Sequence, residues 1–160
     1  MNMFDIAIEM ETEGASFYQQ LADNAGHVGL TKIFTLLKED EIRHKKFFEG
    51  MKNKLKVSVD VSFSESDEVK DLIASFKDDN FSQLLNQKEA YENALDIELK
   101  SIEFYTEQKN KLESESDKQI LDIIIKEERR HYDLLDTIIV MVNRPTSWVE
   151  DAEFGVREPY

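Results

Sequence analysis

Cysteine is absent from this chain of 160 residues. Its absence excludes disulfide bonds, thiol catalysis, zinc ribbons and every iron site that is bound by cysteine. A redox metal, if the protein carries one, must therefore be bound by Glu, Asp and His.

Proline and glycine are also scarce, with two and five residues respectively. Both prolines, Pro145 and Pro159, lie near the C-terminus. Because proline breaks the interior of helices, its absence from the preceding residues leaves them free to be helical. We expect one domain over residues 1–144, followed by a tail, residues 145–160, that packs on this domain or on a partner subunit.

Positively charged residues are also fewer than negatively charged ones. The chain has 20 Lys and Arg against 34 Asp and Glu, which gives a formal net charge of −14. Such a surface repels phosphate backbones, so we expect no nucleic-acid partner. No segment reaches the roughly 18 consecutive apolar residues of a membrane span, and the N-terminus lacks the features of a signal peptide. We therefore expect a cytoplasmic protein without a membrane partner.

Apolar residues recur at spacings of three and four in the segments 3–24, 30–55, 82–112 and 116–142. This spacing predicts four helices, each with one buried face. Residues 56–82 are less regular, and a short helix is expected near 67–76. The sequence therefore predicts an all-α antiparallel four-helix bundle with one long crossover between helices two and three.

The two halves of the chain form an internal repeat. Polar residues in the first half recur 87 positions later (98 − 11, 105 − 18, 128 − 41 and 131 − 44), which matches Glu11 with Glu98, Tyr18 with Tyr105, Glu41 with Glu128 and His44 with His131. One offset without a gap indicates a duplication of a helix pair.

Two Glu-x-x-His pairs, Glu41/His44 and Glu128/His131, lie in otherwise apolar stripes. Residues three apart share one face of a helix, so each pair could bind one metal ion. One glutamate on each remaining helix completes a set known from di-iron bundles, and we predict the metal ligands to be Glu11, Glu41, His44, Glu98, Glu128 and His131. Two divalent cations would cancel the four buried negative charges. Iron suits these ligands, with manganese or zinc as possible substitutes.

Four further residues flank this set. Tyr18 and Tyr105 could be plain core residues, but their position favours hydrogen bonds to ligand carboxylates. Asp40 and Glu127 could accept the second N–H of a metal-bound histidine, or they could belong to a solvated face. The third histidine, His27, lies in a loop between glycines and is predicted to be a surface residue.

The segments EMETEGASFYQQLA, EDEIRH, DIELKSIEFY and EERRH resemble the motifs of the rubrerythrin branch of the ferritin-like superfamily. The resemblance extends over nearly the whole chain and implies a ferritin-like fold with two iron ions. It also implies an oxidoreductase, often one that reduces hydrogen peroxide, which assembles as a homodimer or larger homo-oligomer. By the same resemblance, Tyr18 and Tyr105 are the tyrosines beside the metals, and we assign them a role in catalysis.

Two departures from the family pattern affect these expectations. Typical rubrerythrins carry a rubredoxin domain with cysteine-bound iron, so this chain would need an external electron donor such as a separate rubredoxin. They also carry an extra glutamate three residues from the ligand on the third helix, where this chain has Leu95 and Ser101 around Glu98. The two metal positions are therefore expected to be nearly equivalent.

Three functions remain open from the sequence. The protein could reduce hydrogen peroxide or dioxygen, it could oxidise and handle iron as a ferroxidase, or it could be a non-enzymatic metal-binding bundle.

Overall fold

The computed structural model describes residues 2–60, 62–76, 79 and 81–143. Their regular elements are α1 (Met3–Asp23), α2 (Val28–Lys52), the 3-10 helix η1 (Phe63–Glu65), α3 (Asp67–Ser75), the 3-10 helix η2 (Ser82–Gln87), α4 (Lys88–Lys109) and α5 (Glu115–Asn143). The described residues form no strand, and the prediction of an all-α fold is confirmed. The tail expected at 145–160 lies outside the described residues.

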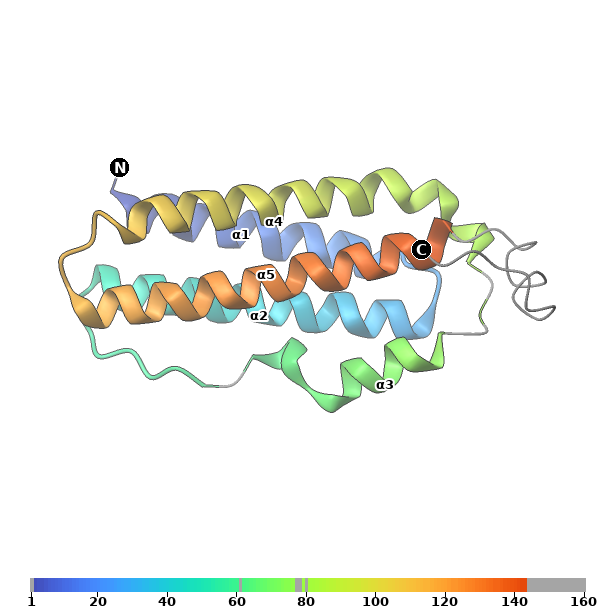
Figure 1. Cartoon of the computed structure of the whole chain (residues 1–160), viewed down its shortest axis with the longest axis horizontal. Helices are drawn as coiled ribbons and strands as arrows, with labels where there is room; N and C mark the ends of the chain where they lie inside the picture. Colours follow the sequence, from blue (N-terminus) through green and yellow to red (C-terminus); the bar gives the residue numbers. More distant parts are fainter. Residues whose placement is uncertain (1, 61, 77–78, 80, 144–160) are drawn as a thin grey trace, which may run out of the picture.

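The four long helices α1, α2, α4 and α5 lie side by side along the long axis of the molecule (Figure 1). Helices α1 and α5 run in one direction, and α2 and α4 run in the other. The segment between α2 and α4 returns along the outside of the molecule and carries η1 and α3. Within this segment, η1 and α3 therefore lie against α2 from outside.

Local hydrogen bonds determine where the first two helices begin. Asn2 Oδ1 accepts a hydrogen bond from Asp5 N at 2.9 Å, and His27 Nδ1 accepts one from Leu30 N at 3.2 Å. Each side chain thus satisfies a free N–H at a helix N-terminus. The side chain of His27 is 21% exposed and contacts the exposed Asp79, so this residue lies partly covered at the surface.

The apolar core consists of two clusters with a polar layer between them. One cluster contains Leu30, Phe34, Tyr91 and Ile138, and the other contains Phe48, Tyr105, Leu121 and Ile124, among other residues. Both clusters use the apolar stripes that run along the long helices. The glutamates and histidines that interrupt these stripes are therefore enclosed in the interior.

None of the helices in the described residues combines the length and the apolar composition that crossing a bilayer requires.

Packing along α5 predicts the effect of two neighbouring substitutions. Ile138 is fully buried, whereas Val140 is 53% exposed. We expect Ile138→Ala to lower the free energy of unfolding by about 2–5 kcal/mol, because it leaves a cavity. Val140→Ala should change it by less than about 0.5 kcal/mol. Urea denaturation of the metal-free protein measures both values, and equal losses would contradict this packing.

Candidate metal centre

The four long helices bring the six predicted ligands into one polar layer. Helix α1 supplies one glutamate and α4 another, while α2 and α5 each supply a Glu-x-x-His pair; the residues are Glu11, Glu98, Glu41/His44 and Glu128/His131. Each is at most 3% exposed. Side chains three residues apart on a helix point the same way, which is why each pair enters the interior together.

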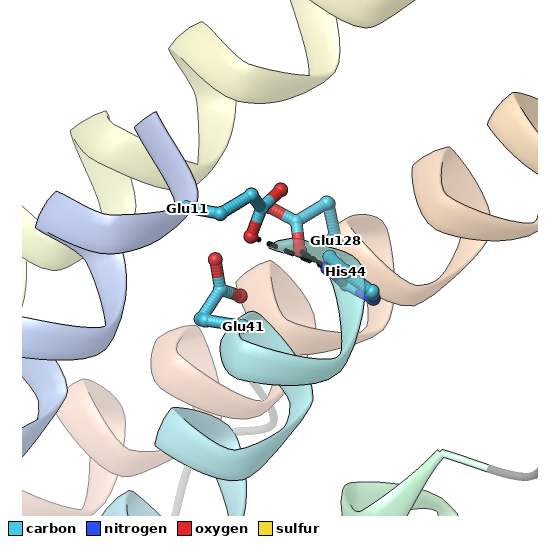
Figure 2. Close-up of side chains that lie close together, drawn as sticks. All are labelled: Glu11, Glu41, His44 and Glu128. Carbon is cyan, nitrogen blue, oxygen red and sulfur yellow. Dashed lines mark ion pairs between the residues drawn. The ribbon is translucent and has the colours of Figure 1, made fainter. Parts of the chain in front are cut away.

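The six residues form two overlapping groups, and within each group one ligand atom per residue lies within 4.8 Å of the others. One group contains Glu11 and His44, and we call it the His44 position (Figure 2). The other contains Glu98 and His131, and we call it the His131 position. Glu41 and Glu128 belong to both groups. Two overlapping groups of this kind could hold two neighbouring cations.

Several polar atoms at the centre make no hydrogen bond and meet only other predicted ligands as ion pairs, which tests whether a metal fits. Buried atoms without a hydrogen bond include Glu11 Oε2, Glu41 Oε1, His44 Nδ1, Glu98 Oε2 and Glu128 Oε1. Buried polar groups normally make hydrogen bonds, whereas His44 Nδ1 and Glu128 Oε1 are only paired as ions at 3.0 Å. Carboxylate oxygen and imidazole nitrogen are suitable ligands for iron, manganese and zinc. The residues present therefore fit a pair of divalent cations.

The pKa values of the buried groups also indicate that the centre suits cations. Burial, together with the charges of Glu98 and Glu11, raises the pKa of Glu128 to about 8. Burial and the neighbouring carboxylates also raise the pKa of Glu41 well above its ordinary value. Burial disfavours a charged His131, but Glu98 and Asp40 outweigh it and raise the pKa of this histidine to about 10. Without cations, the centre retains extra protons to limit repulsion.

Two tyrosines form hydrogen bonds with Glu11 and Glu98, and each tyrosine binds the glutamate of the other helix. Tyr18 on α1 donates a hydrogen bond to Glu98 Oε1 at 2.5 Å, and Tyr105 on α4 donates one to Glu11 Oε1 at 2.7 Å. Burial and the nearby carboxylates raise the pKa of both phenols well above the usual value. Both tyrosines therefore keep their protons and act as hydrogen-bond donors.

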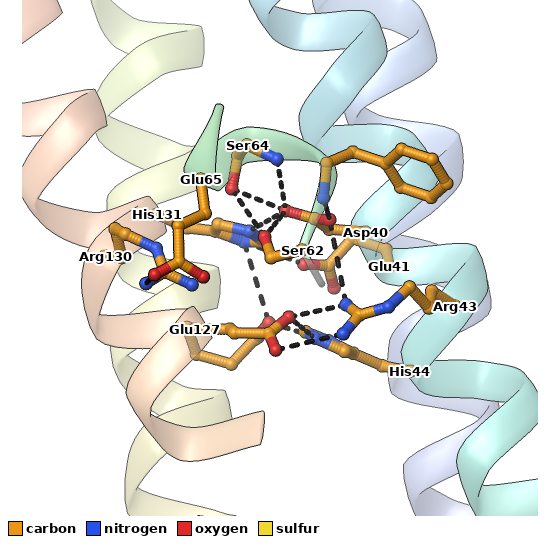
Figure 3. A network of polar contacts seen from close by, with 12 residues as sticks. Asp40, Glu41, Arg43, His44, Ser62, Ser64, Glu65, Glu127, Arg130 and His131 are labelled. Carbon is orange, nitrogen blue, oxygen red and sulfur yellow. Dashed lines mark hydrogen bonds and ion pairs between the residues drawn. The ribbon is translucent and has the colours of Figure 1, made fainter. Parts of the chain in front are cut away.

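The outer nitrogen of each histidine meets a carboxylate on the opposite helix (Figure 3). His44 Nε2 lies 2.9 Å from Glu127 Oε1, and His131 Nε2 lies 2.9 Å from Asp40 Oδ2. A carboxylate at Nε2 favours a proton on that nitrogen and leaves Nδ1 free as a ligand. Asp40 and Glu127 are both buried, so the alternative of a solvated face is wrong for them.

Sequence reasoning missed the residues that support this layer from outside. Arg43 donates to Glu127 Oε1 at 2.7 Å, and Ser62 and Ser64 donate to Asp40 at 2.7 and 2.5 Å. Arg43 lies within the Glu-x-x-His motif of α2, directly before His44, and could have been noticed there. The serines lie in the irregular connection, where no periodicity marks them.

Gly14 is a further residue that sequence reasoning missed. A Cβ at this position would lie 2.9 Å from Glu41 Oε2, so the glycine makes room for a shared glutamate. Glycine in the interior of a helix is destabilising by about 0.5–1 kcal/mol relative to alanine. A glycine within a predicted helix, three residues after Glu11, could therefore have indicated a close contact at this position.

Comparison with known proteins assigns the chain to a family. The family model described as Rubrerythrin matches residues 2–139. No match was found among curated proteins or among solved structures. The matched range contains all six residues of the two groups and the two tyrosines. Since it covers most of the chain, this protein belongs to the rubrerythrin family.

Proposed function

We propose that the protein is a di-iron oxidoreductase that reduces hydrogen peroxide with electrons from an external donor. The observation that carries the proposal is the pair of overlapping ligand groups that share Glu41 and Glu128 in the buried layer. The helix directions and the outer segment between α2 and α4 support a ferritin-like four-helix bundle with one crossover. Family membership supports the choice of iron.

In this proposal each iron position is served by one histidine, one glutamate of its own and the two shared glutamates. Two ferrous ions held there would supply the two electrons that convert hydrogen peroxide and two protons into two water molecules. The protein's own contribution is to hold the ligands on rigid helices and to keep bulk water out of the layer.

The tyrosines complete this arrangement through the glutamates that they hold. Each hydrogen bond is accepted by Oε1 of Glu98 or Glu11, and the Oε2 atoms of both residues accept no hydrogen bond. The tyrosines therefore fix the positions of the Glu11 and Glu98 carboxylates beside the two histidines. We assign Tyr18 and Tyr105 this positioning role in catalysis.

A ferroxidase is the second candidate, and the surroundings of Glu98 favour it. The positions three residues before and after this ligand are Leu95 and Ser101, so no extra carboxylate is available for an iron to move to. In that case Fe(II) itself would be the substrate. The two functions differ in which oxidant the reduced protein prefers and in what accumulates afterwards.

Metal content and ligand variants test the centre itself. We expect about two metal ions per chain after loading with Fe(II), because the two groups have one position each. Glu41→Ala should lower uptake at both positions, since Glu41 belongs to both groups, whereas Glu11→Ala should affect only one. Exposed Glu49→Ala is the control and should keep full content. Elemental analysis measures uptake, and full occupancy in the Glu41 variant would reject the ligand assignment.

The stability of the metal-free protein should depend on pH in a defined direction. The pKa of Glu128 is about 8 in the folded protein against an ordinary value of 4.5, so the folded state holds a proton that the unfolded chain has lost. His131 acts with the same sign at higher pH, because its pKa is raised from 6.5 to about 10. The free energy of unfolding should therefore fall as the pH rises from about 5 to about 8.

Two comparisons assign this pH effect to the centre. Glu128→Gln should reduce the slope, while Glu49→Gln should not change it. Saturating Zn(II) should also reduce the slope, because the metal stabilises the ionised carboxylates. Urea denaturation at several pH values provides the measurement. A free energy of unfolding that increases over this pH range would show that the folded protein does not retain the proton on Glu128.

Reaction with oxidants separates the two candidate functions. We expect peroxide to oxidise the anaerobically reduced, Fe(II)-loaded protein faster than dioxygen does, and turnover to stop unless an external reductant is added. The chain has no cysteine-bound iron to relay electrons. Stopped-flow absorbance with each oxidant measures both rates. A faster reaction with dioxygen, with ferric mineral and a hollow shell in sedimentation analysis, would favour the ferroxidase.

A further inference from the structure

The two histidine positions differ in what lies behind their outer carboxylates. Glu127, the partner of His44, accepts hydrogen bonds from Arg43 Nη1 at 2.7 Å and from Nη2 at 3.2 Å. Asp40, the partner of His131, has no cation at that distance, since Arg43 Nη1 lies 3.8 Å from its Oδ1 atom. Figure 3 shows the guanidinium of Arg43 directed at Glu127. The positive charge of Arg43 is thus closer to Glu127 than to Asp40.

Asp40 is bound instead by neutral donors from the segment between α2 and α4. Its carboxylate accepts hydrogen bonds from Ser62 Oγ at 2.7 Å, Phe63 N at 2.6 Å, Ser64 N at 3.2 Å and Ser64 Oγ at 2.5 Å. These donors carry no formal charge, and Arg43 lies farther from Asp40, at 3.8 Å, than from Glu127, at 2.7 Å, so Asp40 keeps more of its negative charge. The charge therefore remains available to the imidazole of His131.

The internal repeat shows that this difference is a departure from symmetry. Arg130 is the repeat counterpart of Arg43 (130 − 43 = 87), and Asp40 is the counterpart of Glu127 (127 − 40 = 87). Symmetry would place Arg130 on Asp40. The structure instead pairs Arg130 Nη1 with Glu65 Oε1 at 3.2 Å, while η1 residues contact Asp40. The connection occurs once in the chain, so it cannot follow the repeat.

A carboxylate that accepts the outer N–H of a histidine increases the basicity of the metal-binding nitrogen. A guanidinium on that carboxylate withdraws part of this effect and also repels a nearby cation. We propose that Arg43 makes the two metal positions unequal, so that the His131 position binds a divalent cation more tightly than the His44 position. This inference rests on the proposed metal centre, and it replaces the near-equivalence expected from the ligand count alone.

Titration of the metal-free full chain with Co(II) tests the order of binding, with visible absorbance and heat of binding as readouts. We expect two dissociation constants that differ by roughly tenfold or more, within the range that outer hydrogen-bond partners produce. Glu98→Gln should remove the tighter event, and Glu11→Gln should remove the weaker one. These two variants decide the order even if substitutions at Arg43 prevent folding.

Substitutions at Arg43 test the cause. Arg43→Gln can still donate to Glu127 but has no charge, and it should strengthen binding at the His44 position roughly tenfold while leaving the His131 position unchanged. Arg43→Lys keeps the charge and should retain the original ratio of the two constants. Arg130→Gln is the matched control at the repeat-related site and should change neither constant.

Several outcomes would overturn the inference: equal constants in the unaltered protein, an unchanged ratio in Arg43→Gln, or the same change in Arg130→Gln. Loss of the His44 position in Arg43→Gln would also overturn it, because Arg43 would then be only a support for Glu127. Failure of the unaltered protein to take up any Co(II) would reject the metal centre as well, which distinguishes the two failures.

Discussion

The repulsion among four glutamates buried in one layer is the constraint on which the rest of the structure depends. Glu11, Glu41, Glu98 and Glu128 are each at most 3% exposed, and their charges cannot be solvated by water. In the absence of cations the layer must retain protons, as the raised pKa values of Glu41 and Glu128 show. Two divalent cations would remove this conflict, and the carboxylate oxygens that make no hydrogen bond could bind them.

The surroundings of the layer keep its ligands in one arrangement. Tyr18 and Tyr105 link α1 to α4 through hydrogen bonds to Glu98 and Glu11. Glu127 and Asp40 link α2 to α5 through contacts with the two histidines. Apolar clusters enclose the layer on both sides. Ligands on packed helices with fixed hydrogen-bond partners are preorganised, so little reorganisation is needed when a metal binds or changes its charge.

The duplicated helix pair provides the symmetric part of the centre, and the connection between α2 and α4 provides the asymmetric part. Each half contributes the same four polar landmarks at one offset. Ser62 and Ser64 of the connection donate to Asp40, and Arg43 binds both Glu127 and the connecting residue Asp60. A single unrepeated segment can therefore give two otherwise similar metal positions different electrostatic environments.

The sequence by itself determined the helical class, the apolar stripes and the six candidate ligands, because helical periodicity places residues three or four apart on one face. His44 follows Glu41 by three residues, so their shared face needed no tertiary information. The tertiary structure alone decided which carboxylate each histidine contacts, that Gly14 lies against Glu41, and that Ser62 and Ser64 bind Asp40. These contacts join segments far apart in the chain, and an irregular connection has no period from which its position over a helix could be inferred.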